Sequence, residues 1–252
     1  MFEEFGKQFT DEEMIVRAWQ KECIGDTIGR LMNYWGNGER ERAMEELWVR
    51  DPEHRKDASF GTNIGFYVGY DEVRRHFVDE YQQKIYALVK TYADAGITAE
   101  PGTGMTAMHS CTTPLLYIAN DGQTARYMCY DLGMSGQGKA DGTADCYHEF
   151  GLLFVELILE DGEFKIWHVV EEHDFTIESG KDYNDVPYII TDPNDPSFKD
   201  NGNPTIKKEV YNNIYGWEYL YYDMPKPYKT YDEDQGYGPK GKIGRKFYER
   251  MF

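Results

Sequence analysis

The chain has 252 residues and a formal net charge of −18, with 40% hydrophobic and 15% aromatic residues. The charge argues against a nucleic-acid partner, because such binding relies on Lys and Arg side chains that neutralise phosphates. The apolar content is too high for an acidic disordered protein, and a chain of this length can bury a core without disulfides or structural metal ions. We therefore expect an acidic globular protein.

Composition divides the chain into two parts. Residues 1–180 contain 16 basic and 33 acidic side chains, whereas residues 181–252 contain 11 and 12. The second part also holds 11 of the 21 tyrosines, and such aromatic density is rare in disordered tails. We predict a domain over 1–180 and a C-terminal extension over 181–252 that packs on this domain or on a neighbouring subunit.

The sequence shows no export or membrane signal. The first residues lack the basic region and apolar run of a signal peptide, and no stretch approaches the ~20 apolar residues of a membrane span. The four cysteines are widely spaced, without a Cys-x-x-Cys pair. We therefore expect free thiols, a cytoplasmic location and no membrane contact.

Helical patterns fill the first part of the chain. Thr10 and Glu13 form a capping box ahead of apolar residues that recur at helical spacing as far as Trp35. A short helix is predicted over 43–48, and Asp71 is placed to cap a third helix. We expect three helices before any long strand.

The hydrophobic period changes to two after residue 108, which indicates strands. Pro114–Ile118 and Thr124–Tyr130 flank an Asn-Asp-Gly turn, and Cys146–Leu159 and Glu163–Phe175 flank Asp-Gly. The glycine-rich segment Gly133–Gly142 is interpreted as a connection between the two hairpins. Three helices followed by four antiparallel strands give an α+β fold.

The order of these elements resembles a known family. Leu47-Trp48 followed by Asp51-Pro52, the helix start over Gly69–Arg74, and a sheet that ends on Asp161–Ile166 resemble the SnoaL-like branch of the nuclear-transport-factor-2-like superfamily, over about residues 10–178. Its relatives include scytalone dehydratase, bile-acid dehydratase and ketosteroid isomerase. The resemblance implies a cone-shaped α+β barrel: three N-terminal helices over a strongly curved antiparallel sheet, with an apolar pocket. It also implies no cofactor, a small-molecule substrate and a homodimer or homotrimer.

The resemblance also implies site residues. Dehydratases of this family use a tyrosine on the first helix and a histidine on the strand after the third helix, which Tyr34 and His109 resemble. His148 resembles a second pocket histidine of scytalone dehydratase, and His173 lies near the place of an arginine in bile-acid dehydratase. The family's acidic partner would fall near Gly36–Glu39, where only Glu39 is acidic and its register is shifted.

Strand alternation gives a separate prediction for the histidines. If Asp161-Gly162 is a two-residue turn, His148 and His173 share one face of the sheet and His168 points away, unless a bulge intervenes. We expect no metal site, because positions five apart on a strand, such as His168 and His173, face opposite ways. An isomerase would need a carboxylate base in the pocket, for which the sequence offers no clear candidate.

A histidine base with a tyrosine hydrogen-bond donor suits elimination of water beside an activating carbonyl or phenol. We therefore predict a cofactor-independent lyase of the dehydratase type that acts on a small hydroxylated aromatic, polyketide-like or steroid-like compound. The alternatives are a carbon–carbon lyase that releases formaldehyde from a lignin-derived aromatic dimer, and a non-catalytic binding or assembly module. The predicted catalytic residues are His109, Tyr34 and His148, and the predicted substrate-binding residues are His173, Tyr130, Trp167, Tyr67, Arg74 and Phe150.

Overall fold

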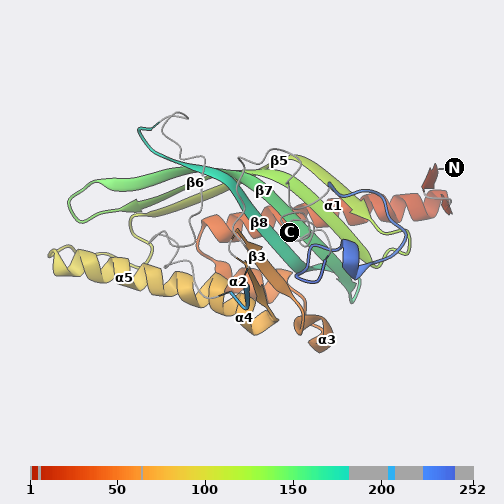
Figure 1. Ribbon diagram of the computed structural model, residues 1–252, viewed down its shortest axis with the longest axis horizontal. Helices are drawn as coiled ribbons and strands as arrows, with labels where there is room; N and C mark the ends of the chain where they lie inside the picture. Colours follow the sequence, from red (N-terminus) through yellow and green to blue (C-terminus); the bar gives the residue numbers. More distant parts are fainter. Residues whose placement is uncertain (1, 5–6, 64, 182–203, 208–223, 242–252) are drawn as a thin grey trace, which may run out of the picture.

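The computed structural model describes residues 2–4, 7–63, 65–181, 204–207 and 224–241 (Figure 1). The helical elements are α1 (Asp11–Gly36), α2 (Arg40–Leu47), α3 (Pro52–Arg55), α4 (Tyr70–Arg74), the π-helical η1 (Arg75–Glu80), α5 (Tyr81–Asp94) and the 3-10 helix η5 (Glu233–Gln235). The strands are β1 (Phe2–Glu4), β2 (Lys7–Phe9), β3 (Ser59–Thr62), β4 (Gly65–Val68), β5 (Met105–Ile118), β6 (Thr124–Gly138), β7 (Ala144–Glu160), β8 (Glu163–Glu178) and β9 (Ile206–Lys207).

The predicted helices are present. The Thr10 hydroxyl accepts a hydrogen bond from the Glu13 amide, and the Glu13 carboxylate accepts one from the Thr10 amide, so the capping box is confirmed. The predicted third helix is divided, because η1 inserts a wider turn between α4 and α5. None of the helices in the described part of the chain combines the length and apolar character that crossing a bilayer requires.

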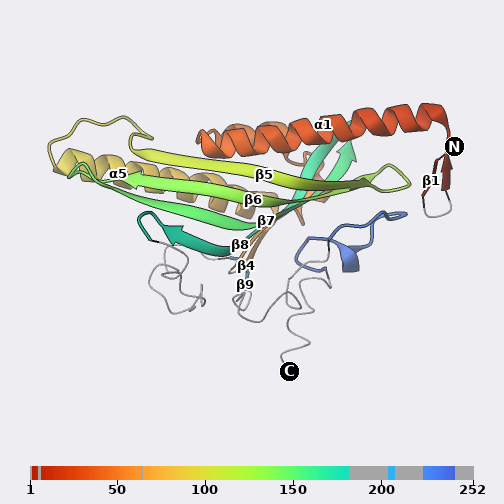
Figure 2. The same ribbon diagram turned by 90° about the horizontal axis from the view of Figure 1, so that it is seen from above.

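The long strands form a curved sheet of order β5-β6-β7-β8-β3-β4-β9, in which β3 and β8 are parallel and the other pairs are antiparallel. Figure 2 shows α1 on one side of this sheet and the segment 224–241 on the other. We call the α1 side the inner face and the opposite side the outer face. Helices packed on a curved antiparallel sheet confirm the predicted α+β fold class.

The glycine-rich segment was predicted wrongly. Residues Gly133–Gly138 belong to β6, and only the end of the supposed connection forms the turn to β7. The glycines lie where neighbouring side chains leave little space: a Cβ on Gly136 would lie 3.2 Å from Cys146 Sγ, and one on Gly138 would lie 2.7 Å from the Tyr92 hydroxyl. These glycines therefore permit close packing within a strand.

Apolar side chains cover both faces of the sheet. The inner core joins α1, α2 and η1 to the sheet, with Trp35, Phe77 and Val155 among its residues. The outer core is smaller and includes Phe154 and Tyr237. Alternating residues of β6 and β7 therefore reach different cores, as expected of a sheet that is covered on both faces.

The described part of the C-terminal extension packs on the outer face. The Asn120 amide donates to the Tyr228 carbonyl at 3.0 Å, and the Tyr237 amide donates to Glu156 Oε2 at 3.0 Å. Residues 182–203, 208–223 and 242–252 lie outside the described residues, so the division of the chain at residue 180 stays a prediction.

Candidate active site

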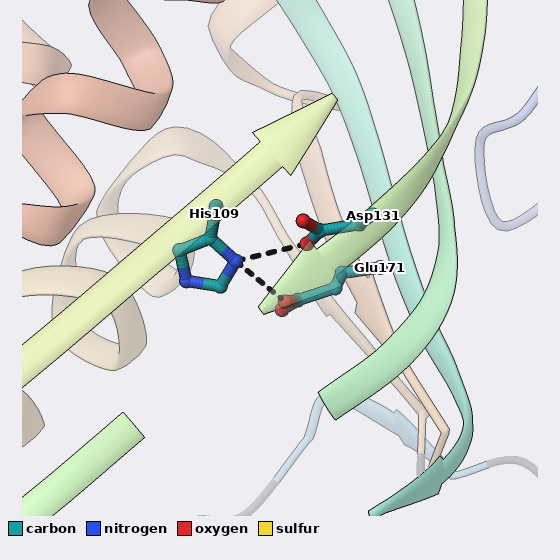
Figure 3. A group of neighbouring side chains, drawn as sticks. All are labelled: His109, Asp131 and Glu171. Atoms are coloured by element: carbon teal, nitrogen blue, oxygen red, sulfur yellow. Dashed lines mark hydrogen bonds and ion pairs between the residues drawn. The ribbon is translucent and has the colours of Figure 1, made fainter. Parts of the chain in front are cut away.

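His109, Asp131 and Glu171 meet on the inner face, each from a different strand (Figure 3). His109 Nδ1 lies 2.9 Å from Asp131 Oδ2 and 3.8 Å from Glu171 Oε1. The three side chains are buried, with exposed fractions of 6%, 2% and 10%. Because an ionised carboxylate only accepts hydrogen bonds, Nδ1 carries the proton that it donates to Asp131. The other ring nitrogen, Nε2, points away from both carboxylates (Figure 3).

Strand register explains this meeting. His109 pairs with Gly133 on β6, and Asp131, two residues before Gly133, projects on the same face. Asp131 pairs in turn with Gly151 on β7, which pairs with His173 on β8. Gly133 has no side chain, and Glu149 lies over it; at Gly151 the backbone of β8 takes the space, since a Cβ there would overlap the Glu172 carbonyl oxygen.

Three further residues extend the cluster. His173 Nε2 lies 3.1 Å from Glu171 Oε1 and 3.9 Å from Glu149 Oε2. The Ser135 hydroxyl donates to Glu149 Oε1 at 2.5 Å. Together with His109 and Asp131, these residues place two imidazole rings against three carboxylates.

The carboxylates control the protonation of both rings. Burial by itself lowers the pKa of His109, but its hydrogen bond to Asp131 and the charges of Glu171, Asp131 and Glu149 outweigh burial and raise that pKa above its ordinary value. Burial also lowers the pKa of His173, yet Glu171 and the other carboxylates raise it to about 9. Burial raises the pKa of Glu171, but His173, His109 and Arg40 bring it down to about 2. His173 and Glu171 are therefore both charged near neutral pH.

Trp35 holds the His109 ring in place. The centroids of the two rings are 4.7 Å apart, and Trp35 itself packs edge-on against Phe77 at 5.1 Å. Asp131 Oδ1 is buried without a hydrogen-bond partner. One oxygen of Asp131 thus orients His109, and the second is left to interact with a bound molecule or with water.

A cavity of about 280 Å³ adjoins the cluster. Its lining includes Ala107, which precedes His109 by two residues on β5 and so faces the same side roughly 7 Å away. Ser135, the hydrogen-bond donor to Glu149, also lines it. The cavity therefore reaches the cluster from the side of α5.

The same cluster could hold a divalent metal ion. The donor atoms of His109, Asp131 and Glu171 lie within 4.8 Å of one another. Imidazole with carboxylate oxygens is a donor set that suits several transition metals. A hydrogen bond of 2.9 Å between His109 and Asp131 accounts for the same geometry without an ion.

The structure brings two of the predicted site residues together, His109 and His173, and places the tyrosine elsewhere. We correct the placement of Tyr34: its hydroxyl donates to Glu46 at 2.9 Å and accepts from Arg30 at 3.1 Å. Adjacent helix positions are about 100° apart, so when Trp35 faces His109 Tyr34 faces α2. No contact joins Tyr34 to His109 in the described part of the chain.

The predicted sharing of one face by His148 and His173 is wrong. The predicted pairing of Glu160 with Glu163 is present, but a bulge between Glu156 and Leu157 adds a residue to β8, so that His173 pairs with Gly151 in place of Phe150. A shift of one residue moves a side chain to the opposite face of the sheet. His148 is exposed on the outer face, and it pairs with Ile177.

The remaining predicted binding residues also lie away from His109. Phe150 and Tyr130 project on the outer face, where Tyr130 is half exposed. Trp167 is buried and donates to Asp57 at 2.8 Å, whereas Arg74 forms ion pairs with Glu41 and Asp79. Tyr67 stacks on His76, which lines the cavity, so Tyr67 supports a cavity wall without reaching its interior.

Sequence reasoning missed the carboxylates. Asp131 continues the inward alternation of Tyr127 and Cys129, and Glu171 and His173 continue that of Val169. Charged residues in the inward register of an apolar strand are the signal that could have found them.

No family model matches the sequence, and no curated protein matches it. Several solved structures are similar in fold. A provisionally named scytalone dehydratase from Novosphingobium aromaticivorans is 10% identical with a TM-score of 0.47, over 67% of this chain and 93% of that chain. Hexachlorocyclohexane dehydrochlorinase LinA-type3 from Novosphingobium barchaimii is 12% identical with a TM-score of 0.47, over 67% and 97%. An NTF2-like protein with a cystatin-like fold from N. aromaticivorans is 14% identical with a TM-score of 0.44, over 66% and 92%.

One of these structures is named a scytalone dehydratase and another NTF2-like. At these identities and TM-scores the likeness assigns neither a reaction nor a site residue to the chain.

Proposed function

We propose that the chain is a lyase that removes water from a small hydroxylated aromatic or related compound by proton transfer at His109, without a metal or organic cofactor. The observation that carries this proposal is the orientation of His109: Nδ1 is bound to Asp131 at 2.9 Å, and Nε2 points away from the carboxylates (Figure 3). A base held by a carboxylate in this way presents one nitrogen in a fixed direction.

Elimination requires a base and an acid. His109 Nε2 removes the proton beside an activating carbonyl or phenol, and the same ring returns it to the departing hydroxide, which leaves as water. His173 lies 3.1 Å from Glu171 and 3.9 Å from Glu149, and its pKa is raised to about 9, so it is an imidazolium that offsets the charge of these carboxylates beside the oxyanion formed between these steps.

The test compares His109 with His148, because the sequence predicted that both are catalytic. Purified protein is screened against hydroxylated aromatic ketones and phenols, with loss of water followed by absorbance of the conjugated product. On any compound that is converted, we expect His109→Gln to lower kcat at least about 100-fold, and we expect His148→Gln, a change on the outer face, to leave kcat unaltered. Full turnover by His109→Gln would contradict the proposal.

The same screen addresses the alternatives. Release of formaldehyde in place of water would favour a carbon–carbon lyase. Compounds that bind but are never converted would favour a binding module. The expected result is conversion with a mass loss of one water.

A further inference from the structure

Arg40 is a cation without a counter-ion in the wall of the cavity, as far as the described residues go. It begins α2, and its guanidinium carbon lies 3.7 Å from the centroid of the Tyr81 ring. Nη1 donates to the Phe77 carbonyl at 3.3 Å, whereas Nε is buried without a hydrogen-bond partner. Because an unpartnered buried donor costs free energy, the position favours an acceptor that the chain itself does not provide.

The other charges around the cavity do not neutralise Arg40. Glu80 lines the cavity, but it accepts from Arg75 and from His76, the latter at 2.7 Å. Burial lowers the pKa of His76, so this ring adds little charge at neutral pH. Lys84 is exposed at the cavity and has no ion-pair partner in the described part of the chain.

The negative charge of Glu171 also attracts Arg40, but Glu171 already contacts two imidazole rings. His173 lies 3.1 Å from Glu171 Oε1 and His109 lies 3.8 Å from it. The cavity therefore has two unmatched cations, Arg40 and Lys84, among the described residues of a chain whose net charge is −18. Local positive charge in a strongly acidic protein indicates recognition of an anion.

We infer that the substrate carries a carboxylate group and that Arg40 binds this group. The planar guanidinium matches a carboxylate in shape and can donate two parallel hydrogen bonds to it. Tyr81, Tyr147 and Met105 also line the cavity and suit an aromatic or other apolar body. The inference rests on the proposed function in one respect, that the bound compound is the one converted at His109.

A carboxylate fits better than a phosphate. Lys84 is exposed, so Arg40, whose Nε is buried, is the cation that an anion meets inside the cavity. The guanidinium of Arg40 matches the single charge and the planar shape of a carboxylate. Trp35 contacts both groups: its ring centroid lies 5.6 Å from the guanidinium carbon of Arg40 and 4.7 Å from the ring centroid of His109. Arg40 and His109 are therefore neighbours across Trp35, which is the placement that the inference requires.

Calorimetric titration of the full-length protein with benzoate, benzamide and inorganic phosphate tests the inference. Benzamide has the shape of benzoate without its charge, so we expect benzoate to bind at least about tenfold more tightly. We expect Arg40→Met to weaken benzoate binding at least about tenfold and Arg40→Lys to weaken it less. Arg42→Met is the matched control, because Arg42 lies on the same helix and is paired with Glu39 and Glu46; benzoate binding should be unchanged.

Three results would overturn the inference: no binding of benzoate up to about 10 mM, equal binding of benzoate and benzamide, or phosphate binding as tight as that of benzoate. Unaltered benzoate binding by Arg40→Met would also overturn it, and the comparison of benzoate with benzamide needs no variant if Arg40→Met does not fold. His109→Gln should still bind benzoate. Benzoate binding together with no loss of water from any hydroxylated aromatic acid in the screen would leave this site in place and contradict the proposed function.

Discussion

Glu149 lies directly over Gly133: a Cβ on Gly133 would lie 3.3 Å from both the Cβ and the Oε2 of Glu149. Gly133 also pairs with His109 on the neighbouring strand. Because Gly133 has no side chain, it leaves room for Glu149 on one neighbouring strand and for His109 on the other. Gly133 lies in the segment that was predicted to be a connection between hairpins, and it helps to build the candidate site.

Replacing Gly133 should disturb the site more than the fold. We expect Gly133→Val to displace Glu149, to loosen its contact with His173, and to lower kcat at least about tenfold. The matched control is Gly25→Ala on α1, where an added Cβ meets nothing within 4 Å. Circular dichroism and kcat are measured for both variants. Wild-type turnover by Gly133→Val would show that Glu149 does not position His173.

The variant Tyr34→Phe tests whether Tyr34 has the catalytic role that the resemblance implied or only the contacts with Glu46 and Arg30 that the structure shows. Because its hydroxyl contacts Glu46 and Arg30, away from His109, we expect kcat to stay within about twofold of wild type. Glu46 keeps its ion pair with Arg42 at 2.7 Å, so the midpoint of urea unfolding should change little. A large loss of kcat with an unchanged KM would return Tyr34 to the catalytic site.

His168 should make the folded state sensitive to acid. Its side chain is buried on the outer face beside Ser59, 2.9 Å away, and burial, with a small contribution from Lys240, lowers the pKa of His168 to about 3. In the unfolded chain the pKa is ~6.5. As pH falls from ~6.5 towards 3 only the unfolded state takes up this proton, so stability falls by up to about 1.4 kcal/mol per pH unit.

Urea unfolding at several pH values between about 7 and 5, the upper part of this range, checks the slope. We expect the free energy of unfolding of His168→Gln to depend less steeply on pH. The difference in slope corresponds to the one proton that His168 takes up on unfolding. The comparison cancels the titration of the other groups that the two proteins share. Equal slopes for the two proteins would contradict a neutral, buried His168.

The contacts within the cluster account for its geometry without a metal ion. His109 Nδ1 lies 2.9 Å from Asp131, and the His173 ring lies between Glu171 and Glu149. We expect dialysis against EDTA, and later addition of Zn²⁺ or Mn²⁺, to leave the midpoint of thermal unfolding unchanged. A rise of this midpoint with metal in the wild type that is absent in Asp131→Asn would assign the cluster to a metal ion.

Local patterns in the sequence predicted several helices and turns within residues 1–180. The capping box at Thr10, the helical spacing up to Trp35 and the turns at 120–122 and 161–162 all depend on neighbours within a few residues, and the structure has each of them. Strand alternation also predicted that alternate residues reach different faces. The α+β class follows from the order of these local elements.

Tertiary structure alone decided which polar groups meet. A bulge in β8 changes the face of His173 relative to His148, and no local pattern marks where an extra residue enters a strand. Asp131, Glu149 and Glu171 come from three strands, and only strand register places them beside His109. Only the resemblance pointed to His109 as a pocket residue; the pairing between strands decided its partners, because hydrogen bonds across a sheet join residues that are distant in the chain.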